Sequence, residues 1–211
     1  MFPNIIQYII TAFKYESEPI IKHFRLSKDP NFNYPVYTSE SIRLVNVGIG
    51  KRNVEHRIMK TYLLKKKYKE EAQFINIGIA GGNENITTIG EGYLVKNIFD
   101  EKSKSFFNCD PLMGYPLKRR SLVTVEKPVN NSKKNDYKEL VDMEASAIIS
   151  TCNKLSPEPR IAIIKIVSDY MDLKKDRLDY KFVYSLIENK IEMINSFLEF
   201  LRKDINKKND F

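Results

Sequence analysis

The amino-acid sequence predicts an α/β layer fold, in which strands alternate along the chain with amphipathic helices. Five short apolar runs, each bounded by glycine or by charged residues, have the length and composition of strands. The last of them, IAIIKIV, is nearly continuous in Ile and Val, which is typical of a strand covered on both faces. The five runs are residues 5–10, 42–47, 74–79, 93–98 and 161–167.

Three further segments have apolar residues at helical spacing. In the first, Val54, Ile58 and Tyr62 recur every four residues and therefore share one face of a helix. The second is rich in small residues, and the third is a long amphipathic pattern that we expect to close the domain. The three segments are residues 51–67, 143–152 and 180–202.

The stretch at residues 100–135 has the weakest periodicity in the chain. It contains several Pro, Lys and Asn residues, so we expect loops around one short strand at residues 122–125. Its aromatic residues Phe106, Phe107 and Tyr115 are equally suited to covering a ligand and to anchoring a loop.

Length and composition limit the classes of protein that the chain can form. With 211 residues, of which 42% are hydrophobic and 29% charged, we expect one domain over residues 1–211. Two cysteines cannot build a disulfide framework or a four-thiolate zinc site, and two histidines add little ligand capacity, so we expect no metal and no cofactor. We interpret Cys109 and Cys152 as inert thiols, and His23 and His56 as residues of helix surfaces.

The net charge of +8 raises the possibility of nucleic-acid binding. Most of the excess is scattered lysine, and the one triple basic run, residues 65–67, suits the solvated end of a helix. The apolar stretch at residues 5–13 is too short for a membrane span and lacks the basic start of a signal peptide. We therefore expect a cytoplasmic protein with no nucleic-acid or membrane partner.

Three glycine-containing segments follow predicted strands. In open α/β sheets ligands bind beyond the carboxyl ends of strands, and glycine allows close approach of the backbone, although tight chain reversal explains an isolated glycine turn equally well. The first segment is not a P-loop, because Val45 and Arg52 stand where glycine and a hydroxyl residue are required. With Asn53 in place of a third glycine it is not a dinucleotide motif either. The segments are residues 48–51, 78–82 and 90–92.

Three carboxylates lie at positions where elements begin or end. Glu16 follows the first strand, Glu144 opens a predicted helix, and Asp169 ends the most buried strand. Each one alone fits a helix cap or a favourable place in the first turn of a helix. Together they suggest acid–base chemistry without histidine.

The chain resembles the purine nucleoside phosphorylase and uridine phosphorylase superfamily, and within it the methylthioadenosine/S-adenosylhomocysteine nucleosidases. The resemblance covers nearly the whole chain, and VDMEASAI with IVSD is its most specific part. It implies a three-layer α/β/α sandwich with a mixed, partly barrel-like central sheet. It also implies a small-molecule nucleoside substrate, no metal, and a homo-oligomer, with a dimer favoured. The motifs are AFKYESEP (12–19), NVGIGKRN (46–53), INIGIAGG (75–82), VDMEASAI (141–148) and IVSD (166–169).

The resemblance also implies a role for each acid. Asp169 is expected to be the general acid that protonates the leaving purine at N7, and Glu16 to orient and activate water. Glu144 is expected to bind the ribose hydroxyls and to stabilise positive charge on the sugar. Cleavage of an N-glycosidic bond needs these groups, because it builds a ribosyl cation and leaves negative charge on the base.

Further substrate-binding residues follow from the same motifs. Met143 is expected to pack against the ribose, and Ser168 to hold Asp169. Ala80 and Gly81, in the third motif, are expected to contact the substrate.

The nucleophile that attacks the sugar distinguishes two possible activities, hydrolysis and phosphorolysis. A phosphorylase must hold a phosphate dianion, which calls for arginine and a hydroxyl residue. Residues 75–82 contain no arginine, and Ile79 stands in place of the usual hydroxyl residue, leaving Arg43 and Arg52 as candidates. We expect hydrolysis, with a phosphorylase that uses inorganic phosphate as co-substrate as the alternative.

The middle of the chain departs from the family. Where the methylthioadenosine enzymes have an aromatic residue that stacks on the base, this chain has TVEKP at residues 124–128. A second alternative is therefore a catalytically weak nucleoside-binding protein.

Overall fold

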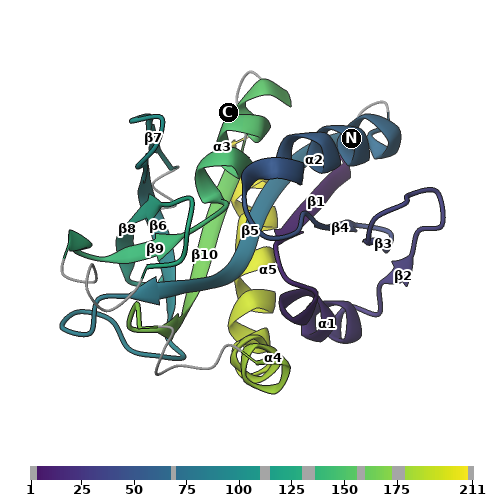
Figure 1. Cartoon of the computed structure of the whole chain (residues 1–211). Coiled ribbons are helices and arrows are strands. Elements are labelled where there is room, and N and C mark those ends of the chain that lie inside the picture. The colour runs from purple at the N-terminus through teal and green to yellow at the C-terminus, as the bar shows by residue number, and fades with distance from the viewer. Residues whose placement is uncertain are drawn as a thin grey trace.

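A mixed β-sheet runs through the middle of the protein and has helices on both faces (Figure 1). The computed structural model describes residues 4–67, 70–109, 115–129, 136–155, 160–172 and 179–208. The strands are β1 (Asn4–Thr11), β2 (Ser27–Lys28), β3 (Val36–Thr38), β4 (Ile42–Asn46), β5 (Glu70–Gly82), β6 (Gly92–Asp100), β7 (Phe106–Asn108), β8 (Arg119–Thr124), β9 (Leu140–Asp142) and β10 (Arg160–Asp169). The helices are α1 (Lys14–His23), α2 (Val54–Lys65), α3 (Ala145–Leu155), α4 (Tyr180–Glu188) and α5 (Ile191–Lys208), and a 3₁₀ turn, Lys51–Asn53, precedes α2.

The sheet closes on itself at one end. Its strand order is β10-β6-β8-β9-β5-β1-β4-β3-β2, and β5 also pairs with β10, so that β5, β10, β6, β8 and β9 form a ring. Strands β1, β4, β5 and β10 are parallel to their neighbours among these four, whereas β6 is antiparallel to β10. The predicted mixed and partly barrel-like sheet is confirmed.

Strand β1 shows how the sequence builds the three layers. Ile6, Tyr8 and Ile10 belong to the core beneath α2 and α3, whereas Ile9 belongs to the core beneath α1, α4 and α5. Successive side chains of a strand point to opposite faces, and both faces of β1 are covered by helices. The predicted α/β/α sandwich is confirmed, and Figure 1 shows the helices on either side of the sheet.

All six predicted strands are present, but the segment expected as a glycine turn at residues 78–82 is part of β5. The strand continues to Gly82 because it is paired on both edges. Lys165 of β10 lies opposite Gly78 on one edge, and Val141 of β9 lies opposite Gly81 on the other. Both flanking strands are distant in sequence, so local turn chemistry could not reveal the pairing.

The C-terminal pattern at residues 180–202 forms two helices rather than one. Helix α4 ends at Glu188 with Asn189 as its cap, and α5 begins at Ile191. Asn is a weak helix former, because its side chain competes for backbone hydrogen bonds. The break lets α4 pack against α1 while α5 lies along the sheet.

The structure also tests smaller predictions about the two histidines, Cys152 and the start of α3. His23 and His56 are exposed on α1 and α2, and Cys152 is fully buried, as predicted. Helix α3 begins at Ala145, so Glu144 immediately precedes the helix instead of opening it. None of the helices in the described part of the chain has the length and apolarity that a membrane span requires.

Candidate active site

A cavity of about 230 Å³ opens where β1, β4, β5 and β10 end. These strands run in parallel, so their carboxyl ends meet at one edge, which is where α/β sheets bind ligands. Six of the seven site residues predicted from sequence line the cavity, and the seventh, Glu16, is not one of the described lining residues. The six are Ala80, Gly81, Met143, Glu144, Ser168 and Asp169.

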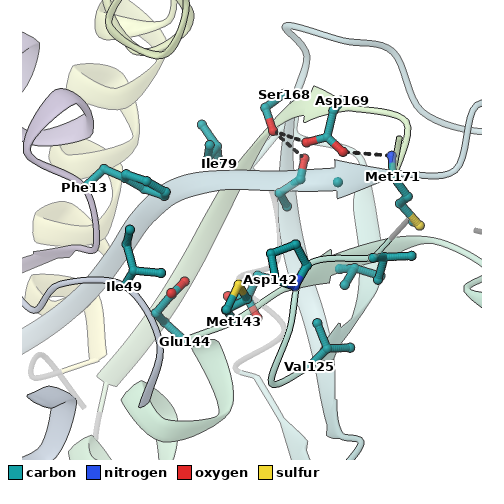
Figure 2. Close-up of a pocket in the computed structure, with 15 residues that line it drawn as sticks. Phe13, Ile49, Ile79, Val125, Asp142, Met143, Glu144, Ser168, Asp169 and Met171 are labelled. Atoms are coloured by element: carbon teal, nitrogen blue, oxygen red, sulfur yellow. Dashed lines mark hydrogen bonds between the residues drawn. The ribbon is translucent and has the colours of Figure 1, made fainter. Parts of the chain in front are cut away.

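Asp169 is held by two donors at one end of the cavity (Figure 2). The Met171 N–H donates to Oδ1 over 2.8 Å, and the Ser168 hydroxyl donates to Oδ2 over 2.6 Å. The same hydroxyl lies 3.3 Å from the carbonyl oxygen of Ala80. When Asp169 carries a proton, Ser168 can therefore donate to Ala80 and accept from the acid. The arrangement supports both protonation states of Asp169.

Two glycines of β5 make room for the acids. A Cβ on Gly81 would lie 3.2 Å from Oδ1 of Asp169, and one on Gly78 would lie 2.9 Å from Oε1 of Glu16. Any larger residue would push the carboxylate away. Gly78 and Gly81 of the INIGIAGG motif therefore allow carboxylate side chains to lie close to the backbone of a strand, and they do not form a turn.

Glu16 lies against β5 at Gly78 and Ile79. Its Oε1 accepts the Ile79 N–H over 2.8 Å, and its Oε2 accepts the N–H groups of Ala12 and Phe13, both over 2.8 Å. The side chain is fully buried. Burial raises its pKa above the ordinary value, although Lys165 and the three N–H donors oppose that shift.

Glu144 lies on the other side of the cavity, beside Met143 and Ile49 (Figure 2). Its Oε1 accepts the Gly50 N–H over 2.6 Å. Burial raises the pKa of Glu144 to about 7, and the negative charges of Asp142 and Glu16 act in the same direction. Lys165 and the Gly50 N–H act against the rise. The carboxylate changes charge close to neutral pH.

A buried ion pair beneath these acids was not predicted. Lys165 of β10 is 2% exposed, and its Nζ lies 2.8 Å from Oδ2 of Asp142, which is 1% exposed. Asp142 also accepts bonds from the Thr124 hydroxyl and the Ala145 N–H. Burial works against the Lys165 ammonium, but Asp142, Glu144 and Glu16 together raise its pKa. The single lysine inside the apolar run IAIIKIV was the signal that could have indicated this pair.

Asp142 of this pair also lines the cavity, and the rest of the cavity wall is apolar. Val125, Val141 and Met171 belong to one apolar cluster, while Phe13 and Ile49 lie on the side of Glu144 (Figure 2). Val125 was expected only as a strand residue, and Phe13 and Ile49 stood inside motifs without an assigned role. Nothing local in the sequence marked them as lining residues.

The aromatic residues proposed to cover a base lie elsewhere. Tyr115 packs on Phe197 of α5 and donates its hydroxyl to the Met193 carbonyl over 3.0 Å, so it anchors the chain to α5. Phe107 packs against the core, and Phe106 is 58% exposed. None of the three is among the described lining residues.

The described lining residues include no Arg, Lys or His. Arg43 donates to the carbonyl oxygens of Ser39 and Ile42, and Arg52 is exposed on the 3₁₀ turn. Neither of these two candidates for binding phosphate faces the cavity. Within the described ranges, no group of three or more His, Cys, Asp or Glu side chains is placed to hold a metal ion.

The raised pKa of Glu144 predicts how its replacement changes stability. Between the ordinary value of 4.5 and about 7, only the folded chain binds the proton, so stability falls as pH rises through this interval. We expect Glu144→Gln to melt at a higher temperature than the wild type at pH 8, with a difference that shrinks toward pH 5. Thermal melts at both pH values measure this. A difference that grows toward pH 5 would contradict it.

No family model and no curated protein matches the chain. Among solved structures, a 5′-methylthioadenosine/S-adenosylhomocysteine nucleosidase from Helicobacter pylori aligns with a TM-score of 0.77 at 15% identity, over 94% of this chain and 99% of that chain. MTAN from Chlamydia trachomatis aligns with a TM-score of 0.70 at 20% identity, over 91% and 98%. Futalosine hydrolase of Helicobacter pylori aligns with a TM-score of 0.77 at 14% identity, over 93% and 98%.

These structures are members of the nucleoside phosphorylase and nucleosidase superfamily. The chain has their fold over nearly its whole length, which confirms the fold class expected from the sequence motifs. The likeness extends to enzymes with different substrates, so the activity must be inferred from the cavity.

Proposed function

We propose that the protein is a nucleosidase that hydrolyses the N-glycosidic bond of a purine nucleoside or a related thioether nucleoside without a metal. The observation that carries this proposal is the single cavity that has Asp169 at one end and Glu144 at the other. A nucleoside offers a base to the first acid and a sugar to the second. The nucleosidase and hydrolase neighbours support the same class of reaction.

Asp169 acts as the general acid in this proposal. It donates a proton to N7 of the purine as the bond to the sugar breaks, so the base leaves without negative charge. Ser168 keeps the carboxyl group oriented, since it can accept from Asp169 while it donates to Ala80. The Met171 N–H holds the other oxygen.

Glu144 binds the sugar in this proposal. The Gly50 N–H occupies one acceptor site of the carboxylate, and a carboxylate has about four, which leaves capacity for ribose hydroxyls. Its negative charge stabilises the oxocarbenium-like cation that forms as the bond breaks. Met143 lines the cavity next to it and packs on the ribose.

Glu16 orients the attacking water in the same proposal. Its carboxylate accepts three N–H bonds, so about one acceptor site is left for water. The water must reach it past Ile79, which lines the cavity and donates to Oε1. The charge of Glu16 is one of the causes that raise the pKa of Glu144, which supports an electrostatic interaction between the two carboxyl groups.

Hydrolysis is favoured over phosphorolysis by the lining of the cavity. Phosphate binding requires cationic or hydroxyl donors, and the described lining residues supply Ser168 but no Arg, Lys or His. We expect incubation with methylthioadenosine, adenosine or inosine to release free base and free sugar at a rate that does not depend on phosphate. Chromatography of the products measures this. Formation of a sugar 1-phosphate in phosphate buffer would instead assign the chain to the phosphorylases.

A nucleoside-binding protein with weak turnover is the second candidate. The observation in its favour is that Glu16 is fully buried and is not one of the described residues that line the cavity. A nucleoside that raises the melting temperature without release of base would select this candidate.

A further inference from the structure

The glycine-containing segment at residues 48–50 joins β4 to the 3₁₀ turn and contacts the cavity in two ways. The Ile49 side chain lines it (Figure 2), and the Gly50 N–H donates to Oε1 of Glu144 over 2.6 Å. The two partners are 94 residues apart in sequence, so the bond joins two separate elements beneath the cavity. This segment therefore contacts the Glu144 carboxylate directly, through a backbone hydrogen bond.

The backbone of Gly50 is one that other residues rarely adopt. Its φ is +74° and its ψ is 177°, which is essentially restricted to glycine. A Cβ at this position would meet nothing within 4 Å. Space is thus not the reason for the glycine. The requirement is the dihedral pair that aims the N–H at Glu144.

We propose that Gly50 is a positioning residue, whose N–H fixes the orientation of the Glu144 carboxylate and favours its charged form for binding the ribose. The contribution to ribose binding rests on the proposed nucleosidase function, whereas the contact itself does not. A charged acceptor makes such a bond stronger than one between neutral groups.

The other charges around Glu144 show why one N–H matters. Asp142 and Glu16 disfavour its ionised form, and so does burial. Within the described part of the chain, Lys165 and the Gly50 N–H favour the ionised form, and Lys165 is already paired with Asp142. Loss of the N–H would raise the pKa of Glu144 further and increase the neutral fraction of the carboxyl group at physiological pH.

The contact can be tested on the wild-type protein without any substrate. We expect the amide proton resonance of Gly50 to move downfield as pH rises through about 7, because the bond strengthens when Glu144 ionises. The movement should be absent in Glu144→Gln. A Gly50 resonance that does not respond to pH between 5 and 9 would overturn the proposal, whatever the protein's activity.

The functional consequence is tested with Gly50→Ala. We expect kcat/KM to fall about tenfold at pH 6.5, in line with loss of a bond to a charged group. The loss should shrink to less than about threefold at pH 9, where Glu144 is ionised in both proteins. The acidic limb of the rate profile should accordingly move to higher pH.

Gly90→Ala is the matched control. Gly90 also has a positive φ, of +84°, and a Cβ there would make only an ordinary contact of 3.9 Å with Leu186. The substitution also forces a residue other than glycine into a positive φ, away from the cavity lining, so it should lower the melting temperature without moving the acidic limb. Equal losses at pH 6.5 and pH 9 in Gly50→Ala would mean that its effect is only structural and would overturn the positioning role. If Gly50→Ala does not fold, the resonance experiment decides.

Discussion

Asp169→Asn is expected to lower the rate of base release by about 100-fold or more, because an amide cannot supply the acidic proton that the leaving base requires. The substitution keeps the shape of the side chain. Asn can still accept the Met171 N–H and bond to the Ser168 hydroxyl, so the melting temperature should stay close to that of the wild type. Single-turnover assays with methylthioadenosine, followed by quantification of free base, give the rate.

Ser168→Ala is the matched control for Asp169→Asn. It removes the hydroxyl that orients the acid but leaves the acid in place, so its rate should lie between those of the wild type and Asp169→Asn. An unchanged rate in Asp169→Asn would remove this residue from the mechanism. Equal losses in the two variants would mean that orientation, and not proton donation, limits the reaction.

Lys165→Met is expected to lower the free energy of unfolding by about 3–5 kcal/mol, the cost of leaving a buried charge without its partner. Lys165 and Asp142 are both almost completely buried, and methionine cannot compensate the Asp142 carboxylate. Glu144 and Glu16 lose the same positive charge. Urea denaturation at neutral pH measures the loss.

The double variant Lys165→Met/Asp142→Asn separates charge from packing. Asn can retain a bond to the Thr124 hydroxyl and the Ala145 N–H while it removes the unpaired charge. We expect it to recover more than half of the stability lost in Lys165→Met. A double variant that is less stable than the single variant would show that the ion pair is not the source of the loss.

The extent to which sequence predicted the fold depends on the element. Strand β10 was recognised because its run of Ile and Val is buried on both faces and leaves a continuous apolar pattern. The end of β5 was misassigned, since its glycines suggested a turn, whereas pairing with β9 and β10 holds them in a strand. The strand β9, with three residues, was too short to leave a pattern.

The candidate site was predicted in part. Asp169 and Glu144 were identified from motifs at the ends of elements, and the cavity brings them together as expected. Glu16 was expected with them, and it is fully buried against Ile79 but is not one of the described lining residues. Lys165 was missed, because a single lysine in a buried strand has no local partner in the sequence.

By itself, the sequence determined six of the strands, the two covered faces of the sheet, and the acids at the ends of elements. These features depend on local apolar periodicity and on short motifs. Both signals lie within short stretches of sequence. Only the tertiary structure decided which acids share a cavity, which cation lies beneath them, and that the Gly50 N–H meets Glu144. Those contacts join residues that are from 23 to 94 positions apart, and their geometry is set by packing between elements rather than by any one of them.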